Sequence, residues 1–127
     1  MGQIIKLSCS KCGYSMEANV GAGMGACNPM IIKGCLKGEE LNKWNSLYDN
    51  QELAMFSSDM HIGKCPTCNT LRNIFLVKAV TKDDTHIELG GTCDVCGSKC
   101  TTCDDEDIVC PECKEAKLGK GFVGYWD

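Results

Sequence analysis

Five Cys-x-x-Cys pairs in a chain of 127 residues limit its fold more than any other feature of the sequence. Two thiolates separated by two residues converge on one small cation, because the tight turn between them aims both sulfurs inward. Two such pairs complete a tetrahedral shell for zinc. The sequence therefore predicts at least two structural zinc sites. The five pairs are Cys9/Cys12, Cys65/Cys68, Cys93/Cys96, Cys100/Cys103 and Cys110/Cys113.

The purely apolar core of such a chain is modest. The hydrophobic share of 43% includes twelve cysteines, and aromatic residues make up only 6% of the chain. Metal binding adds an apparent ~10–16 kcal/mol per structural zinc site at neutral pH, which is enough to decide folding. We therefore expect a small metal-stabilised α+β fold, built from zinc-ribbon β-hairpins with one amphipathic helix.

The meaning of the cysteines depends on the compartment, because dense cysteines form disulfides where the surroundings are oxidising. Residues 1–6 do not have the charged and apolar regions of a secretory leader. No stretch approaches the roughly 20 apolar residues of a membrane span. We expect a cytoplasmic protein without membrane contact, in which the cysteines bind zinc.

The charge of the chain bears on its partners. The formal net charge is −4, and each four-thiolate site with a dication adds two further negative charges. An acidic protein repels phosphates unless its basic residues are clustered. The sequence disfavours a nucleic-acid partner without excluding one, and it favours a protein partner.

The first half of the chain reads as a hairpin followed by a helix. Residues 4–7 and 14–20 are expected strands around the first cysteine pair, and Gly13 permits the positive φ that such a turn needs. The glycines of residues 21–25 interrupt regular structure. Residues 38–48 predict an amphipathic helix, and residues 53–56 are expected to extend the helical layer. The apolar positions of the helix at 38–48 are Leu41, Trp44, Leu47 and Tyr48.

The second half predicts more β-structure. Residues 71–80 and 86–89 are expected strands around a turn at 82–85. The acidic run at 104–107 is expected to form a second turn, and the aromatic tail at 122–126 is expected to dock on the core. We expect one compact unit with two regions. Residues 1–89 form a split zinc ribbon with an insertion at about 21–60, and residues 90–127 form a C-terminal ribbon plus the tail.

The spacing favours one assignment of cysteine pairs to metals. Thirteen residues separate Cys93/Cys96 from Cys110/Cys113, which suits two short strands and a turn, so we assign these four to one zinc. Cys9/Cys12 and Cys65/Cys68 then share the second zinc. A competing assignment joins Cys65/Cys68 to Cys93/Cys96 across the 71–89 hairpin, and Cys9/Cys12 then needs Cys27, Cys35 or Cys100/Cys103.

Four cysteines have no clear place in this scheme. Cys27 and Cys35 are isolated, and only six residues separate Cys103 from Cys110. These four are either free thiols or a third metal site. Iron is an alternative to zinc, although the four-cysteine run of bacterial ferredoxins is missing.

With these residues placed, the chain resembles a group of small bacterial zinc-ribbon proteins of uncharacterised function. The resemblance implies a metal-stabilised, β-rich fold with no activity attached, and Cys27, Cys35, Cys100 and Cys103 depart from its pattern. The shared marks are Cys9-Ser10-Lys11-Cys12-Gly13-Tyr14, the glycine patch at 21–24, Gly38-Glu39-Glu40-Leu41, Cys65-Pro66-Thr67-Cys68, the Cys93 to Cys113 segment and Trp126-Asp127.

The expected function is a non-catalytic zinc-binding module that acts as a protein-interaction or regulatory adaptor. Shells of four thiolates leave zinc no open position for water or substrate. The two histidines, His61 and His86, lie in no metal motif. Two alternatives stay open, namely a nucleic-acid-binding ribbon of the transcription type and a thiol redox or metal-sensing protein.

Overall fold

The structure is a computed structural model that describes residues 2–23, 25–103 and 108–126. The acidic turn expected at 104–107 lies outside these ranges, as do Met24 of the glycine patch and the terminal Asp127. The described part is mostly antiparallel β-structure with two helices.

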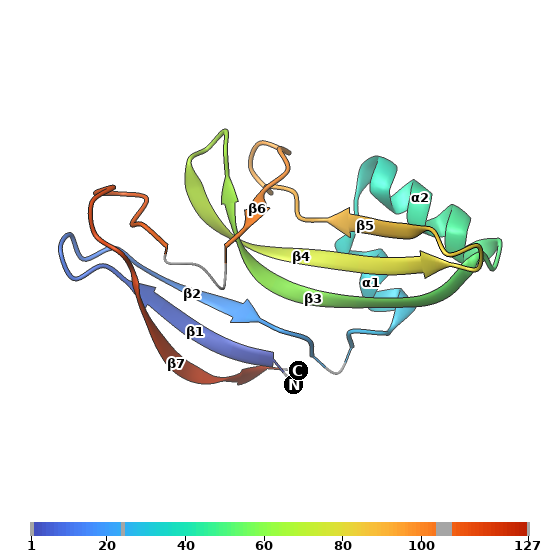
Figure 1. Ribbon diagram of the computed structural model, residues 1–127, viewed down its shortest axis with the longest axis horizontal. Helices are drawn as coiled ribbons and strands as arrows, with labels where there is room; N and C mark the ends of the chain where they lie inside the picture. Colours follow the sequence, from blue (N-terminus) through green and yellow to red (C-terminus); the bar gives the residue numbers. More distant parts are fainter. Residues whose placement is uncertain (1, 24, 104–107, 127) are drawn as a thin grey trace.

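Two sheets lie side by side along the long axis of the molecule (Figure 1). In the first sheet, β1 (Gly2–Ser8) lies between β2 (Ser15–Val20) and β7 (Gly119–Trp126), and both pairings are antiparallel. The first and last strands of the chain are therefore neighbours. The N-terminal and C-terminal segments belong to one sheet.

The second sheet has the order β5-β4-β3-β6. Its centre is the long hairpin of β3 (Leu53–Cys65) and β4 (Thr70–Thr81), with β5 (His86–Gly90) beside β4 and the short β6 (Thr101–Thr102) beside β3. A single bridge between Gly21 and Met60 connects the end of β2 to β3. The two sheets therefore touch at this point, while the chain between β2 and β3 forms the two helices.

Two helices pack against the second sheet. The Asn28 side chain caps α1 (Pro29–Cys35) by accepting a hydrogen bond from the Met30 backbone N–H, and α2 (Gly38–Asp49) has Glu39 and Glu40 in its first turn. Trp44 of α2 is 1% exposed and meets Phe56 of β3 edge to face, with ring centroids 5.1 Å apart. This contact fixes the helical layer to the sheet.

The described residues form two apolar cores, one under the helices and one between the two sheets. The core under the helices contains Ile32, Leu36, Trp44, Val77 and Leu89. The other core lies between the sheets and includes two cysteine side chains among its aliphatic residues. Its members are Leu7, Cys9, Ala18, Ile62, Leu71, Ile108, Cys110 and Leu118. Two cysteines are thus buried where apolar side chains would otherwise be needed.

Most expected elements are present. The strands at 4–7, 14–20, 71–80 and 86–89 correspond to β1, β2, β4 and β5, and the helix at 38–48 corresponds to α2. The sequence did not predict α1, because this short helix begins with Pro29, contains Gly34 and shows little helical periodicity. The described chain also contains no helix with the length and apolar composition that a membrane crossing requires.

Two expectations were wrong. Residues 53–56 do not extend the helical layer, because Gln51 adopts a positive φ of 56° after α2 and Leu53 already begins β3. The C-terminal segment does not form a ribbon of its own. β6 pairs with β3, and β7 pairs with β1 in the first sheet. Strand pairing therefore crosses the boundary expected between residues 89 and 90.

The aromatic tail docks only in part. Trp126 lies over Gly2, where any added Cβ would meet the indole ring at 2.3 Å, and its Nε1 donates to the Val20 carbonyl. Phe122 and Tyr125 remain 59% and 62% exposed. The tail is therefore anchored by its last aromatic residue, and the other two face solvent.

Replacing Trp44 with alanine should destabilise the protein by about 3–5 kcal/mol, because the substitution leaves a large cavity between α2 and the sheet. Urea unfolding of Trp44→Ala and wild type checks this value. Tyr48→Ala is the matched control, since Tyr48 stacks on Trp44 but is 44% exposed and should cost less. An equal loss of unfolding free energy in the two variants would contradict the place of Trp44 in the core under the helices.

Candidate metal centres

The described residues contain two groups of four cysteines that could each hold a metal ion. In each group the four sulfurs all lie within 4.8 Å of one another. The first group, site 1, consists of Cys9, Cys12, Cys110 and Cys113, and the second, site 2, consists of Cys65, Cys68, Cys93 and Cys96. Site 1 joins the ends of the chain, and site 2 lies at the tip of the β3–β4 hairpin.

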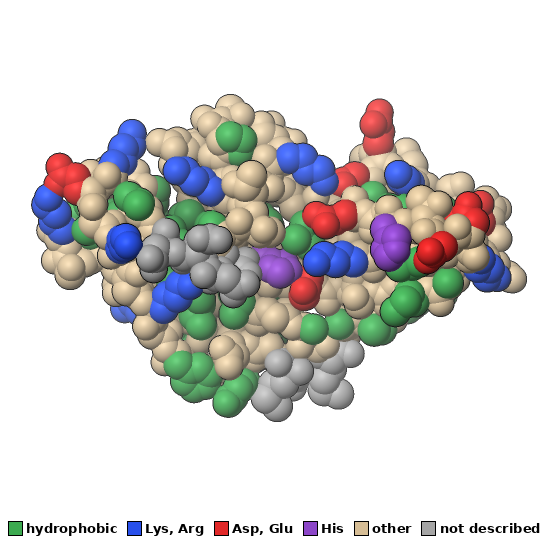
Figure 2. All heavy atoms as spheres, viewed as in Figure 1, with side chains coloured by type: hydrophobic (Ala, Val, Ile, Leu, Met, Phe, Trp, Pro, Cys, Tyr) green, Lys and Arg blue, Asp and Glu red, His purple; other side chains and the backbone are tan. Residues whose placement is uncertain are grey.

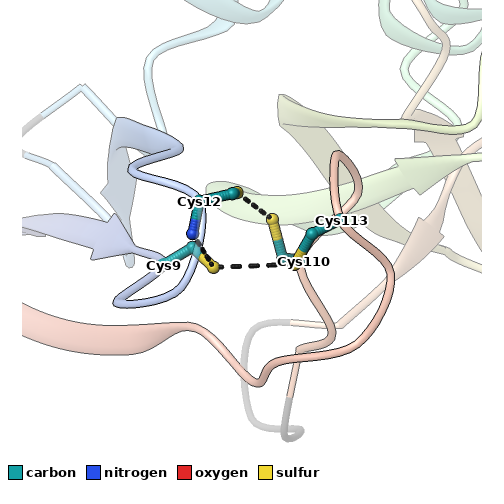
Figure 3. Close-up of side chains that lie close together, drawn as sticks. All are labelled: Cys9, Cys12, Cys110 and Cys113. Atoms are coloured by element: carbon teal, nitrogen blue, oxygen red, sulfur yellow. Dashed lines mark hydrogen bonds between the residues drawn. The ribbon is translucent and has the colours of Figure 1, made fainter.

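Site 1 is formed by two loops that face each other (Figure 3). The Cys9 and Cys113 sulfurs are 3.7 Å apart, and those of Cys12 and Cys110 are 3.5 Å apart. Cys9 and Cys110 are buried, whereas Cys12 is exposed. In site 2 the Cys65 and Cys96 sulfurs are 3.4 Å apart, and those of Cys68 and Cys93 are 3.9 Å apart.

The favoured assignment of pairs was wrong. It placed Cys93/Cys96 with Cys110/Cys113 and Cys9/Cys12 with Cys65/Cys68, whereas the structure exchanges the partners. The competing assignment of Cys65/Cys68 to Cys93/Cys96 is the one observed, but Cys9/Cys12 meets Cys110/Cys113. The physical reason is that β7 pairs with β1, which carries Cys110/Cys113 to the N-terminal hairpin.

The four loops that carry these cysteines share one backbone geometry. In each loop, the residue after the second cysteine has a positive φ and donates its backbone N–H to the carbonyl of the first cysteine. The φ values are 82° at Gly13, 55° at Asn69, 77° at Gly97 and 60° at Lys114. The expectation for Gly13 is confirmed. These turns aim both sulfurs of a pair at the same point, as a bound cation requires.

In one loop of each site, a backbone amide also points at sulfur. The Cys12 N–H donates to the Cys9 sulfur at 3.4 Å, and the Cys68 N–H donates to the Cys65 sulfur at 3.3 Å. Such hydrogen bonds favour the charged thiolate over the neutral thiol. At Cys9 this hydrogen bond is the main cause of a lowered pKa.

The fifth pair, Cys100/Cys103, is not such a loop. Its middle residues Thr101 and Thr102 form β6, so the pair is extended and does not turn. Side chains three residues apart on a strand point to opposite faces. The Cys100 and Cys103 thiols therefore cannot bind the same ion. Cys103 packs against the core between the sheets, and its thiol lies 3.5 Å from the Ile62 carbonyl.

The other two cysteines are single. Cys27 and Cys35 are exposed and belong to neither site. Within the described residues, Cys27, Cys35, Cys100 and Cys103 do not form a third group. His61 is also outside both groups, and its Nε2 lies 3.0 Å from an Asp59 carboxylate oxygen.

Charge is shared unevenly among the thiols of site 1. The Cys12 backbone N–H lowers the pKa of Cys9, and the Ala116 backbone N–H lowers the pKa of Cys113. The pKa of Cys12 is raised to about 11, because desolvation and the nearby Cys110 outweigh the Tyr14 backbone, which lowers it. The surroundings thus lower the pKa of some thiols of the cluster and raise that of another.

Site 2 shows the same division. Hydrogen bonds from Ser98 lower the pKa of Cys96 to about 6, and the Cys96 backbone N–H lowers the pKa of Cys93. The Cys96 sulfur and desolvation raise the pKa of Cys68 to about 12. The cluster cannot ionise fully without a cation to compensate the negative charge.

Arg72 and Cys100 lie beside site 2. Hydrogen bonds with the Cys93 and Cys68 sulfurs raise the pKa of Arg72, and its Nε lies 3.8 Å from an Asp94 carboxylate oxygen. Desolvation and the nearby Cys65 and Cys93 raise the pKa of Cys100 to about 11. The guanidinium supplies one positive charge, which offsets only part of the charge of four thiolates.

The donor sets fit zinc. Structural zinc takes four cysteine thiolates in a tetrahedral arrangement, and two turn-borne pairs are the usual source of such a set. Among the described residues, each group consists of four thiols alone, and both contain two converging Cys-x-x-Cys turns. Bound there, a dication would neutralise half the charge of the thiolates and remove the repulsion that keeps Cys12 and Cys68 protonated.

The signal that separates the fifth pair from the other four lies partly in the sequence. Glycine follows the second cysteine in Cys9/Cys12 and Cys93/Cys96, and asparagine follows it in Cys65/Cys68. All three tolerate positive φ. Asp104 follows Cys103 in the sequence, and the two threonines inside the pair favour a strand.

No family model matches the sequence, and no curated protein or solved structure matches it.

Double substitutions test which pairs share a metal. Cys9→Ser/Cys110→Ser should lower the metal content from two ions per chain to one, because both residues belong to site 1. Cys93→Ser/Cys110→Ser should lose both ions, because the residues belong to different sites. Elemental analysis of the purified variants measures this. If Cys9→Ser/Cys110→Ser lost both ions and Cys93→Ser/Cys110→Ser lost only one, the assignment favoured by spacing would be correct.

Metal affinity should rise with pH. The pKa values of about 11 for Cys12 and about 12 for Cys68 mean that each site must release at least one proton at neutral pH. Apparent affinity should therefore fall about tenfold per pH unit for each proton as the pH decreases from 8 to 6. Competition with a chelator of known pH dependence measures it. An affinity that does not change over this range would contradict the thiolate sites.

Proposed function

We propose that this is a non-catalytic zinc-binding protein whose two zinc ions fix a platform for binding another protein. The observation that carries the proposal is the composition of the two clusters, since each consists of four thiols on converging turns. Four thiolates complete the coordination of zinc, and a zinc ion without an open position cannot activate water or substrate. The ions would act on the structure of the chain.

The positions of the clusters support this structural role. Cys9 and Cys113 are 104 residues apart in the sequence, and Cys65 and Cys96 are 31 residues apart. Zinc at site 1 would tie the β1–β2 turn to the loop before β7. Zinc at site 2 would tie the β3–β4 turn to the loop before β6. Both ions would cross-link segments that are distant in the sequence, and at site 1 the cross-link would lie beside the core that contains Leu7, Ile108 and Leu118.

The surface that such a platform would offer is the outer edge of β7. Among the described residues, no strand pairs with this edge of the first sheet. Phe122, Val123 and Tyr125 are 59%, 51% and 62% exposed, and the rings of Phe122 and Tyr125 meet at 5.0 Å. Figure 2 shows hydrophobic side chains gathered at the lower left, where Figure 1 draws β7.

The partner that fits this edge is an extended segment of another protein. A free strand edge presents unpaired N–H and C=O groups that an added strand can use, and proteins commonly protect long edges with several charges or a proline. β7 has neither protection, since Lys120 is its only charged residue and it contains no proline. The acidic net charge of −4 favours a protein partner over nucleic acid.

A photoactivatable amino acid in place of Phe122 tests the proposal in cells. It should form cross-links to one protein, which mass spectrometry identifies. The purified wild-type chain should then bind that protein, and the substitutions Phe122→Ser/Tyr125→Ser should weaken binding at least tenfold. The matched control is Met55→Ser, since Met55 is 66% exposed on β3 of the other sheet and should not matter.

Three outcomes would contradict this function. Cross-links to RNA or DNA, together with binding that weakens steeply with salt, would favour the nucleic-acid alternative. Equal binding by wild type and the β7 variant would remove this edge as the platform. Iron in the purified protein in place of zinc would move the interpretation to electron transfer.

A further inference from the structure

Cys100 lies directly across from a ligand of site 2. β3 and β6 pair antiparallel, with Gly63 opposite Thr102 and Lys64 opposite Thr101. This register places Cys100 opposite Cys65. Residues directly opposite in an antiparallel pair have their Cβ atoms ~4.5–5.5 Å apart and point to the same face of the sheet. Cys100 therefore presents its thiol on the same side as the Cys65 sulfur.

Two further contacts hold Cys100 in this place. Its backbone N–H donates to the Gly91 carbonyl at 2.8 Å, which ties it to the loop that leads into Cys93. Its Cβ would lie 3.1 Å from a Cβ added at Gly63, so glycine at that position admits the cysteine side chain. Cys100 is thus closely packed against the β3 backbone that carries Cys65.

One of the four ligands of site 2 is well placed to leave. Cys96 is exposed, whereas Cys65 and Cys93 are buried. Its sulfur is 3.4 Å from that of Cys65, the ligand that Cys100 faces. Cys96 and Cys100 are therefore both neighbours of Cys65.

We propose that Cys100 is a fifth thiol of site 2 that can replace Cys96 as the fourth zinc ligand. The inference rests on the proposed function, since it concerns the zinc of that site. In the exchange, the zinc–sulfur bond to Cys96 breaks and one to Cys100 forms. The proton of the Cys100 thiol passes to the Cys96 thiolate, and zinc stays divalent throughout.

The two sites then differ in kind. The zinc of site 1 remains a fixed cross-link between the ends of the chain. The zinc of site 2 has one interchangeable ligand, and each exchange turns the exposed Cys96 into a free thiol at the surface. Site 2 would therefore be the site at which an electrophile or an acceptor of zinc reaches the protein.

Single and double substitutions test the exchange. Cys96→Ser should keep two metals per chain, and its cobalt(II) form should keep the absorption of two four-sulfur sites, because Cys100 takes the vacant position. Cys96→Ser/Cys100→Ser should retain one metal under chelator competition. Cys96→Ser/Cys103→Ser is the matched control and should behave like Cys96→Ser, because Cys103 packs against the core between the sheets.

A measurement on the unsubstituted protein does not depend on how the variants fold. Iodoacetamide should alkylate Cys96 of the zinc-loaded wild type at least tenfold faster than Cys12, and the singly alkylated chain should keep both zincs. Cys12 is the matched control because it is the exposed ligand of site 1. Peptide mass spectrometry gives both rates.

The results separate this inference from the proposed function. Two zincs in wild type but one in Cys96→Ser would overturn the role of Cys100 and leave the function standing. A four-sulfur spectrum for both sites in Cys96→Ser/Cys100→Ser would also overturn it, as would equal alkylation of Cys96 and Cys12. A wild-type chain without metal would overturn the function itself.

Discussion

The fold depends on the convergence of four sulfurs at each of two points. Thiolates held within 4.8 Å repel one another, and the low pKa of Cys96 beside the high pKa of Cys68 shows that the cluster resists full ionisation. A dication turns this repulsion into attraction. Turns with positive φ at Gly13, Asn69, Gly97 and Lys114 prepare the arrangement, and they are of little use to the chain without an ion to bind.

This constraint explains how a small apolar core supports two sheets. The core between the sheets contains Cys9 and Cys110, so metal ligands stand where a larger protein would use aliphatic side chains. Site 1 and the pairing of β7 with β1 act on the same segment, because the loop that carries Cys110/Cys113 precedes β7. A metal ion at site 1 would therefore also help to hold the exposed edge with Phe122 and Tyr125 in place.

Local features were predictable from the sequence, and long-range pairings were not. The period of Leu41, Trp44, Leu47 and Tyr48 predicted α2, and alternation and branched residues predicted β4 and β5. The eight cysteines of the two clusters are those that the spacing singled out as ligands. Their partners could not be deduced, since loop closure costs little more for a long segment than for a short one. The long-range contact that brings Cys110/Cys113 to Cys9/Cys12 is the pairing of β1 with β7.

Removal of metal tests the central claim most directly. A strong chelator in reducing buffer should strip both ions, and the protein should then lose its near-UV circular dichroism and its cooperative thermal transition, which two equivalents of zinc should restore. A metal-free chain that melts cooperatively at the temperature of the untreated protein would contradict the account.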